Sequence, residues 1–195
     1  MIVRDIFACS MRMQLNFIVI VTLLCIVSGC HTAQVAEPLT QKLGGSDADT
    51  QMEFWHQLAD RPVTCNDEAF HGLLLYLDGK DDNADYAARV ASMKSRGLLP
   101  ASFDRPASES VTRGNLAVAI AHALNIKGGL IMHLGASNVP RYATRELIYL
   151  EIYPASSPQQ TFSGTEFLGI MGKVEDWQRG NVDVPATELA PEQPQ

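Results

Sequence analysis

Apolar and polar positions alternate at helical spacing through the middle of the chain, and almost no segment has the two-residue alternation of a strand. Capping residues and Gly or Pro stops divide this region into successive helices. The sequence therefore predicts an all-α fold. The helices that we expect cover residues 52–59, 64–77, 84–96, 112–126, 140–150 and 163–174, while 130–134 is compatible with a helical turn or an extended stretch.

Three of the predicted helix starts share one pattern, an apolar residue followed by a hydroxyl cap. They are Val63-Thr64, Val111-Thr112 and Phe162-Ser163, and successive caps lie 48 and 51 residues apart. Ser163 and Glu166 have the spacing of a capping box, and Val111/Leu116 and Phe162/Phe167 have the spacing of a hydrophobic staple. The pattern predicts a repeated unit of helix, loop and capped helix, present twice in full and once, at the front, in degraded form.

The first thirty residues have the composition of an export signal. A short basic start precedes an apolar run from Phe17 to Val27, which is too short to span a bilayer because a spanning helix needs about 20 residues. Val27-Ser28-Gly29-Cys30 resembles the lipobox of bacterial lipoproteins, which implies cleavage before Cys30 and acylation, including palmitate, of that residue. A plain secretory signal and an uncleaved anchor helix are the alternatives. Met1, Met11 or Met13 could be the true start.

Composition limits the possible partners of the mature chain. Without residues 1–29 the chain has 166 residues, with 13 basic and 21 acidic side chains and a net charge of −8. That balance argues against nucleic acid as a partner. Because Cys30 is acylated, Cys65 has no partner for an intramolecular disulfide. A packed, unreactive thiol is favoured over a reactive one.

Domain boundaries follow from Pro, Gly and polar residues at both ends. We expect a signal peptide over 1–29, a lipidated flexible tether over 30–50, one helical domain over 51–177 and a disordered tail over 178–195.

The middle helix pair carries a resemblance to a known family. Tyr86-Ala87, Gly97-Leu98-Leu99, Phe103-Asp104-Arg105-Pro106 and Val111-Thr112-Arg113 follow in order the pattern of the S-layer homology (SLH) repeat, with Tyr in place of Trp. The second full unit lacks Phe-x-x-Pro and has Ser163-Gly164 in place of Thr-Arg, and the first start has Thr64-Cys65.

The resemblance implies two to three helix-loop-helix repeats packed as a pseudo-threefold helical bundle that binds a cell-wall polysaccharide. Arg113, at the first position after Thr112, is then the expected partner for a sugar carboxylate, because a helix N-terminus and a guanidinium both favour anions. Thr112 and Arg113 are therefore the candidate ligand-binding residues, and Cys30 is the lipidation site.

No motif in the sequence points to catalysis, a cofactor or a metal. The histidines of the mature chain lack zinc-ligand spacing, and Asp78, Asp81, Asp82 and Asp85 around Gly79 are better explained as a solvated acidic turn than as a calcium loop. A nucleophile elbow is also missing.

Three functions remain possible from sequence. The first is a non-enzymatic, lipid-anchored envelope protein that binds a wall glycan or an envelope protein. The second is a scaffold lipoprotein that binds only other proteins, and the third is an enzyme acting on wall polymers. The residue after the lipidated cysteine is His31 rather than Asp, which in Gram-negative lipoproteins indicates the outer membrane, on the periplasmic face or the cell surface.

Overall fold

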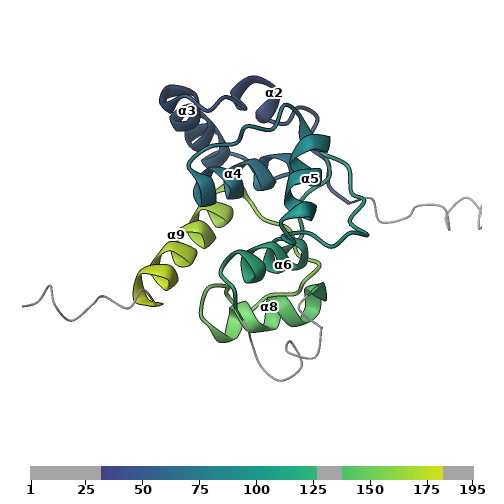
Figure 1. Cartoon of the computed structure of the whole chain (residues 1–195), viewed down its shortest axis with the longest axis vertical. Coiled ribbons are helices and arrows are strands. Elements are labelled where there is room, and N and C mark those ends of the chain that lie inside the picture. Colours follow the sequence, from purple (N-terminus) through teal and green to yellow (C-terminus); the bar gives the residue numbers. More distant parts are fainter. Residues whose placement is uncertain (1–31, 127–137, 182–195) are drawn as a thin grey trace, which may run out of the picture. The chain divides into compact units, whose positions relative to one another are not determined.

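The computed structural model describes residues 32–126 and 138–181, which apart from Thr32 belong to one compact unit beginning at Ala33. These residues form helices joined by loops and by isolated bridges, so the predicted all-α class is confirmed (Figure 1). The predicted signal, the acylated Cys30 and the ambiguous stretch 130–134 lie outside the described residues. The helices are α2 (Thr40–Leu43), α3 (Ala48–Ala59), α4 (Asn66–Asp78), α5 (Tyr86–Ser95), α6 (Arg113–Ala123), α8 (Pro140–Tyr149) and α9 (Gly164–Asn181).

Side-chain caps start the helices, as expected from the sequence. Thr112 accepts a hydrogen bond from the Asn115 amide at 3.2 Å at the start of α6. At α9, the Glu166 carboxylate accepts from the Ser163 amide at 2.9 Å, and the Ser163 hydroxyl accepts from the Glu166 amide at 3.2 Å. The predicted capping box is therefore confirmed, and it satisfies amide groups that the helix itself leaves free.

The start of α4 differs from the prediction by one residue. Cys65, not Thr64, is the N-cap, and Glu68 three residues later accepts from the Cys65 amide at 3.0 Å. Thr64 is instead held extended, because its amide donates to Phe162 and its carbonyl accepts from Val111. The position in α4 that corresponds to Arg113 is consequently Asn66.

Two helices are longer than expected. Helix α3 begins at Ala48, and not at residue 52, because Asp47 caps it, accepting a hydrogen bond from the Thr50 amide at 2.9 Å. The last, α9, extends to Asn181, several residues beyond the predicted end at 174 and into the predicted tail. Tyr76 of α4 donates a hydrogen bond to Gln178, which ties this extra length of α9 to the rest of the unit.

Glycines end two helices where the backbone must turn back. Gly79 after α4 and Gly97 after α5 have φ angles of 71° and 72°, the left-handed region in which a side chain is strained. Gly97 was expected at this place.

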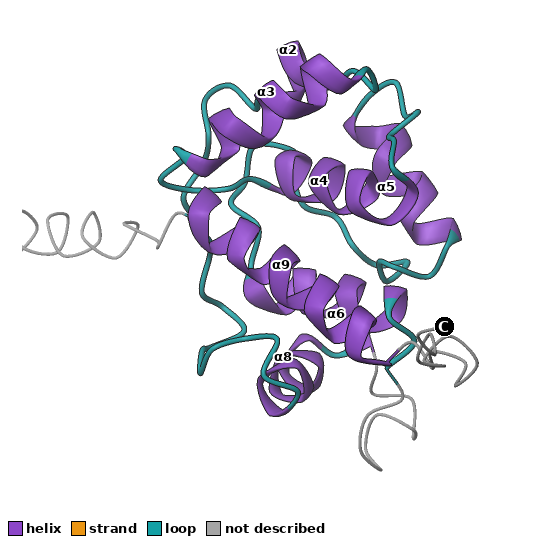
Figure 2. Ribbon diagram, turned by 90° about the vertical axis from the view of Figure 1, so that its left-hand side faces the viewer, coloured by secondary structure: helices purple, strands orange, loops and turns teal. Residues whose placement is uncertain are grey.

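The core is built around α4 and α6. Every residue of α4 from Asn66 to Leu75 is buried, and so are most residues of α6. Figure 2 shows these two helices between α3 above and α8 below. Phe54, Phe70, Phe162 and Phe167 are among the largest fully buried side chains, and full burial of such a side chain stabilises the fold by about 1.5–3 kcal/mol.

The segment that precedes α3 packs on this core, which differs from the flexible tether expected over 30–50. Val35 and Leu39 are each only 9% exposed, and the Leu39 amide donates to buried Glu68 at 3.0 Å. Apolar residues at these two positions, isolated among polar ones, gave too short a pattern for the sequence to predict docking.

Across the unit, α8 packs on α6, and α9 packs on α3 and α4. The grouping of the helices into two to three helix-loop-helix repeats, and their pseudo-threefold, SLH-like arrangement, stay predictions. Within the part of the chain that the structure describes, every helix is too short or too polar to cross a membrane.

Candidate functional site

The starts of α4, α6 and α9 are held together by backbone hydrogen bonds between the residues that precede them. The Thr64 amide donates to Phe162 at 2.9 Å, the Val111 amide donates to Thr64 at 3.0 Å, and the Arg113 amide donates to Gln160 at 2.7 Å. These bonds fix three positive helix ends close together in a mostly buried environment.

Arg113 occupies the first position of α6 with only 5% of its surface exposed. Its Nη2 donates to Glu166 Oε1 at 2.7 Å, and its guanidinium carbon lies 4.7 Å from the centre of the Phe162 ring. Its Nε is buried and has no hydrogen-bond partner among the described residues. The side chain is therefore buried while part of its donor capacity is unused, an arrangement that costs free energy.

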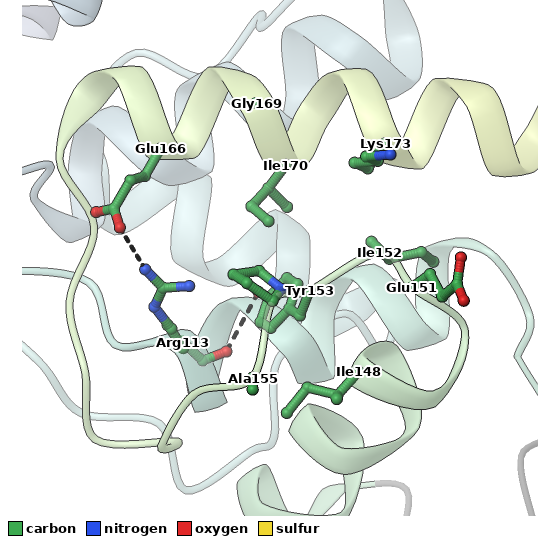
Figure 3. A pocket seen from close by; sticks show the side chains of 11 residues that line it. Arg113, Ile148, Glu151, Ile152, Tyr153, Ala155, Glu166, Gly169, Ile170 and Lys173 are labelled. Carbon is green, nitrogen blue, oxygen red and sulfur yellow. Dashed lines mark hydrogen bonds and ion pairs between the residues drawn. The ribbon is translucent and has the colours of Figure 1, made fainter.

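A groove of about 490 Å³ opens beside Arg113, between α9 and the chain that follows α8. Figure 3 shows Glu166 binding one nitrogen of Arg113 while another nitrogen points toward the hollow near Tyr153. The walls are mainly apolar, and Glu151 and Lys173 add charges. The lining residues are Arg113, Ile148, Glu151, Ile152, Tyr153, Pro154, Ala155, Glu166, Gly169, Ile170 and Lys173.

Glu166 is the counter-ion of Arg113 and is itself half-exposed, with 52% of its side chain accessible. The hydrogen bond from the Ser163 amide, and then the charge of Arg113, hold the pKa of Glu166 below its ordinary value of 4.5, although burial acts in the opposite direction. Glu166 is thus ionised at neutral pH, and an anionic ligand at Arg113 would compete with it.

Tyr153 forms the floor of the groove. Its hydroxyl donates to the Arg113 carbonyl at 3.3 Å, and burial raises its pKa well above the ordinary value of 10. The phenol therefore stays neutral and acts as a wall and a hydrogen-bond donor. Tyr149 of α8, which does not line the groove, is 81% exposed.

The other two helix starts do not hold an arginine like Arg113. At α9 the corresponding residue is Gly164, where a Cβ atom would lie 1.5 Å from the Leu58 carbonyl oxygen. The backbone at the end of α3 is so close that any side chain would displace it. At α4 the corresponding residue is Asn66, whose amide nitrogen donates to Pro106 at 2.9 Å. The departure from the Thr-Arg pattern has a packing cause at α9.

A second charged cluster was missed by the sequence analysis. Arg89 of α5, 3% exposed, donates to Asp81 Oδ2 at 2.6 Å and to Asp67, and Asp67 also accepts from the Thr40 hydroxyl. His71 Nδ1 lies 2.6 Å from the same Asp81 oxygen. The expected solvated acidic turn is therefore wrong at Asp81, which is 4% exposed.

Hydrogen bonds within this cluster offset the cost of burying Asp81. Burial by itself raises the pKa of Asp81, but hydrogen bonds from His71, Asn83 and Arg89 outweigh it and hold that pKa well below the ordinary 3.8. Only tertiary structure brings these residues together, although an arginine on the apolar side of a helix was a possible signal.

Among the described residues, neither Cys65 nor a metal site adds a further chemical function. The Cys65 thiol is buried, and burial, followed by the charge of Glu68, raises its pKa above the ordinary 9.0, so that the nucleophilic thiolate is disfavoured. In the described ranges 32–126 and 138–181, no group of three His, Cys, Asp or Glu side chains could hold a metal ion.

Comparison with known proteins adds no relative. No protein-family model, no curated protein and no solved structure matches the chain.

Proposed function

We propose that this protein is a non-enzymatic, lipid-anchored protein of the bacterial cell envelope whose helical domain binds a ligand in the groove beside Arg113. Acylation of Cys30 would hold it in the membrane, and His31 favours the outer membrane. More than one acyl chain is needed for a firm anchor, because a single chain binds only marginally.

The observation that carries the proposal is the state of Arg113. Arg113 is 5% exposed and lies at a helix N-terminus, at the edge of a groove. Among the described residues its Nε has no partner, and its counter-ion is a half-exposed carboxylate. A carboxylate would gain a charge-assisted, planar partner there. An acidic cell-wall polysaccharide is therefore the first ligand that we propose.

A second candidate is a scaffold function in which the groove receives an apolar side chain of an envelope protein. The apolar walls favour it, with Ile148, Ile152 and Ile170 among the lining residues. The ion pair with Glu166 favours it as well, because it already neutralises Arg113.

Co-sedimentation with purified sacculi tests the first candidate. The chain without its signal, carrying Cys30→Ser, is compared with its Arg113→Ala and Arg113→Lys variants. We expect Arg113→Ala to weaken binding by about 1.5–3 kcal/mol, the usual worth of a hydrogen bond to a charged group. Arg113→Lys should recover only part of this, because the planar fork is lost.

Arg96→Ala is the matched control, because Arg96 also pairs with a carboxylate, Asp78, but does not line the groove. Its sedimentation should equal that of the parent. Sacculus binding that is unchanged in Arg113→Ala would reject the Arg113 site. If the parent chain does not sediment but captures an envelope protein through the groove, the scaffold function replaces the glycan.

A further inference from the structure

The first described residues of the mature chain are bonded to a distant loop. The Ser110 amide donates to the Ala33 carbonyl at 2.9 Å, and the Val35 amide donates to Ser108 at 2.8 Å. Gln34 and Glu109 form an antiparallel bridge between these two bonds. The chain thus becomes part of the folded unit at Ala33.

The docking continues along the segment to Leu43. The Leu39 amide donates to Glu68, a fully buried carboxylate, and the Thr40 hydroxyl donates to Asp67 of the Arg89 cluster. Arg61 donates to the Glu37 carbonyl at 2.7 Å. Because these bonds reach buried carboxylates of α4, residues 33–43 cannot leave the unit without removing one hydrogen-bond partner from each of Asp67 and Glu68.

This docking shortens the covalent path from the lipid to the fold. Two residues, His31 and Thr32, lie between Cys30 and Ala33, and the three Cα–Cα steps from Cys30 to Ala33 span at most about 11 Å when fully extended. A flexible tether of the length expected from sequence, about 20 residues, would have a root-mean-square span of about 25 Å.

We infer that the docked segment 33–43 leaves only a short covalent connection between the fold and the lipid anchor, so that the helical unit lies against the membrane with the 105–110 loop beside the lipid headgroups. The inference rests on the proposed acylation of Cys30. The partner of this face is the lipid surface itself. The short covalent connection, and not charge attraction, brings the face to that surface, since the exposed loop residues Asp104 and Arg105 carry opposite charges.

Energy transfer to the membrane surface tests the inference. The full lipidated protein is reconstituted in phosphatidylethanolamine–phosphatidylglycerol vesicles that carry an acceptor dye on their headgroups. A donor dye is placed on Ser108→Cys or on Arg179→Cys, and buried Cys65 does not compete for the label. Figure 1 shows why the second site is a far reporter: the described chain begins on one side of the unit and α9 ends on the other.

We expect energy transfer from a donor at Ser108→Cys to be several-fold faster than from one at Arg179→Cys, whichever way the unit turns about its connection to the lipid. A Gly/Ser insertion of 20 residues between Thr32 and Ala33 should reduce transfer at Ser108 and bring the two sites toward equal values. Equal transfer at both sites in the parent, or no effect of the insertion, would overturn the inference.

A second variant tests docking without a change of length. Leu39→Asp places a charge in the apolar contact of the segment and should lower transfer at Ser108 while circular dichroism stays helical. Unchanged transfer in a folded Leu39→Asp protein would also contradict the inference. Mass spectrometry of the N-terminus is the separate check of the proposed function, because an unacylated Cys30 would remove the anchor and not the docking.

Discussion

Arg89 and Arg113 are both buried arginines at helix positions, but their partners differ. Arg89 is 3% exposed and binds two carboxylates that are themselves buried, Asp67 and Asp81. Arg113 is 5% exposed and has one carboxylate, Glu166, which is half in solvent, while its Nε is unpartnered. Arg89 is thus paired with two buried carboxylates, and together with Asp67 it also lines a pocket of about 530 Å³. Arg113 has spare donors and opens on the groove beside α9.

The difference indicates two roles for buried charge in one fold. The Arg89 ion cluster fixes how α4, α5 and the segment 33–43 pack, because it joins Asp67, Arg89 and Thr40 from these three parts. An under-partnered guanidinium beside a groove is less well satisfied, and a ligand carboxylate can remove that deficit. The comparison predicts that Arg89 acts on stability and Arg113 acts on binding.

The largest expected effect is that of Arg89→Met. It leaves Asp67 and Asp81 buried without their cation, and breaking a buried ion pair in this way costs about 3–5 kcal/mol. Arg113→Met should cost only about 1–2 kcal/mol, since Glu166 can turn to solvent and the contact with Phe162 is the main loss. Urea unfolding of the chain without its signal measures both changes. Equal losses of unfolding free energy in the two variants would contradict the distinction between Arg89 and Arg113.

The acid dependence of Asp81 comes next. Because the folded pKa of Asp81 is depressed below its ordinary value of 3.8, its ionisation stabilises the fold above about pH 4, and this contribution is lost as the pH falls toward the lower folded value. Asp81→Asn should therefore be less stable than the parent by at least about 2 kcal/mol at pH 7, with a gap that narrows below pH 4.

Unfolding of the parent and of Asp81→Asn at a series of pH values measures that gap. Asp82→Asn is the control, because Asp82 pairs with Lys80 at an exposed site where 65% of its side chain is accessible. A gap between parent and Asp81→Asn that stays constant from pH 7 to pH 3 would show that the carboxylate charge of Asp81 contributes nothing.

Sequence reasoning located the helices and the Arg113 start because the signals there are local. A hydroxyl cap, an apolar staple and a glycine stop act within a few residues, so Thr112, Ser163 and Gly97 could be identified without tertiary contacts. Thr64 was misassigned as a cap because Cys65, an uncommon cap residue, takes that place once Thr64 pairs with Phe162.

The groove and the Arg89 cluster depend on contacts that no local pattern encodes. Asp81 and Arg89 are eight residues apart, but their burial depends on Asp67 and Thr40 from two other helices. Glu166 could be predicted as a capping residue, whereas its second oxygen reaches Arg113, 53 residues earlier. Charged residues at such places look solvated in a sequence, because their partners are distant along the chain.

Glu166→Gln sharpens the comparison by removing the competitor of a ligand at Arg113. Gln at this position can still accept the Ser163 amide, so the capping box remains while the negative charge disappears. If an acidic glycan binds Arg113, Glu166→Gln should increase sacculus binding by up to about 1.5–3 kcal/mol, the range of a charge-assisted bond. Weaker binding in this variant would mean that Glu166 itself contacts the ligand.

The smallest expected effect compares two glycines of α9. Gly169 lines the groove and Gly172 does not, and a Cβ atom at either position would meet no heavy atom within 4 Å. Glycine inside a helix is less favourable than alanine by about 0.5–1 kcal/mol, so Gly169→Ala and Gly172→Ala should each stabilise the chain by that amount in urea unfolding. The replacements differ only in what they place in the groove.

Larger side chains make the difference measurable. Gly169→Gln should narrow the groove beside Arg113 and reduce binding to sacculi or to a captured envelope protein, while Gly172→Gln should leave binding at the level of the parent. Both variants should keep the stability of the parent or exceed it, since neither side chain enters the core. Equal binding of the two variants would place the ligand away from this groove, and Arg113 would then be a buried structural residue like Arg89, only less completely paired.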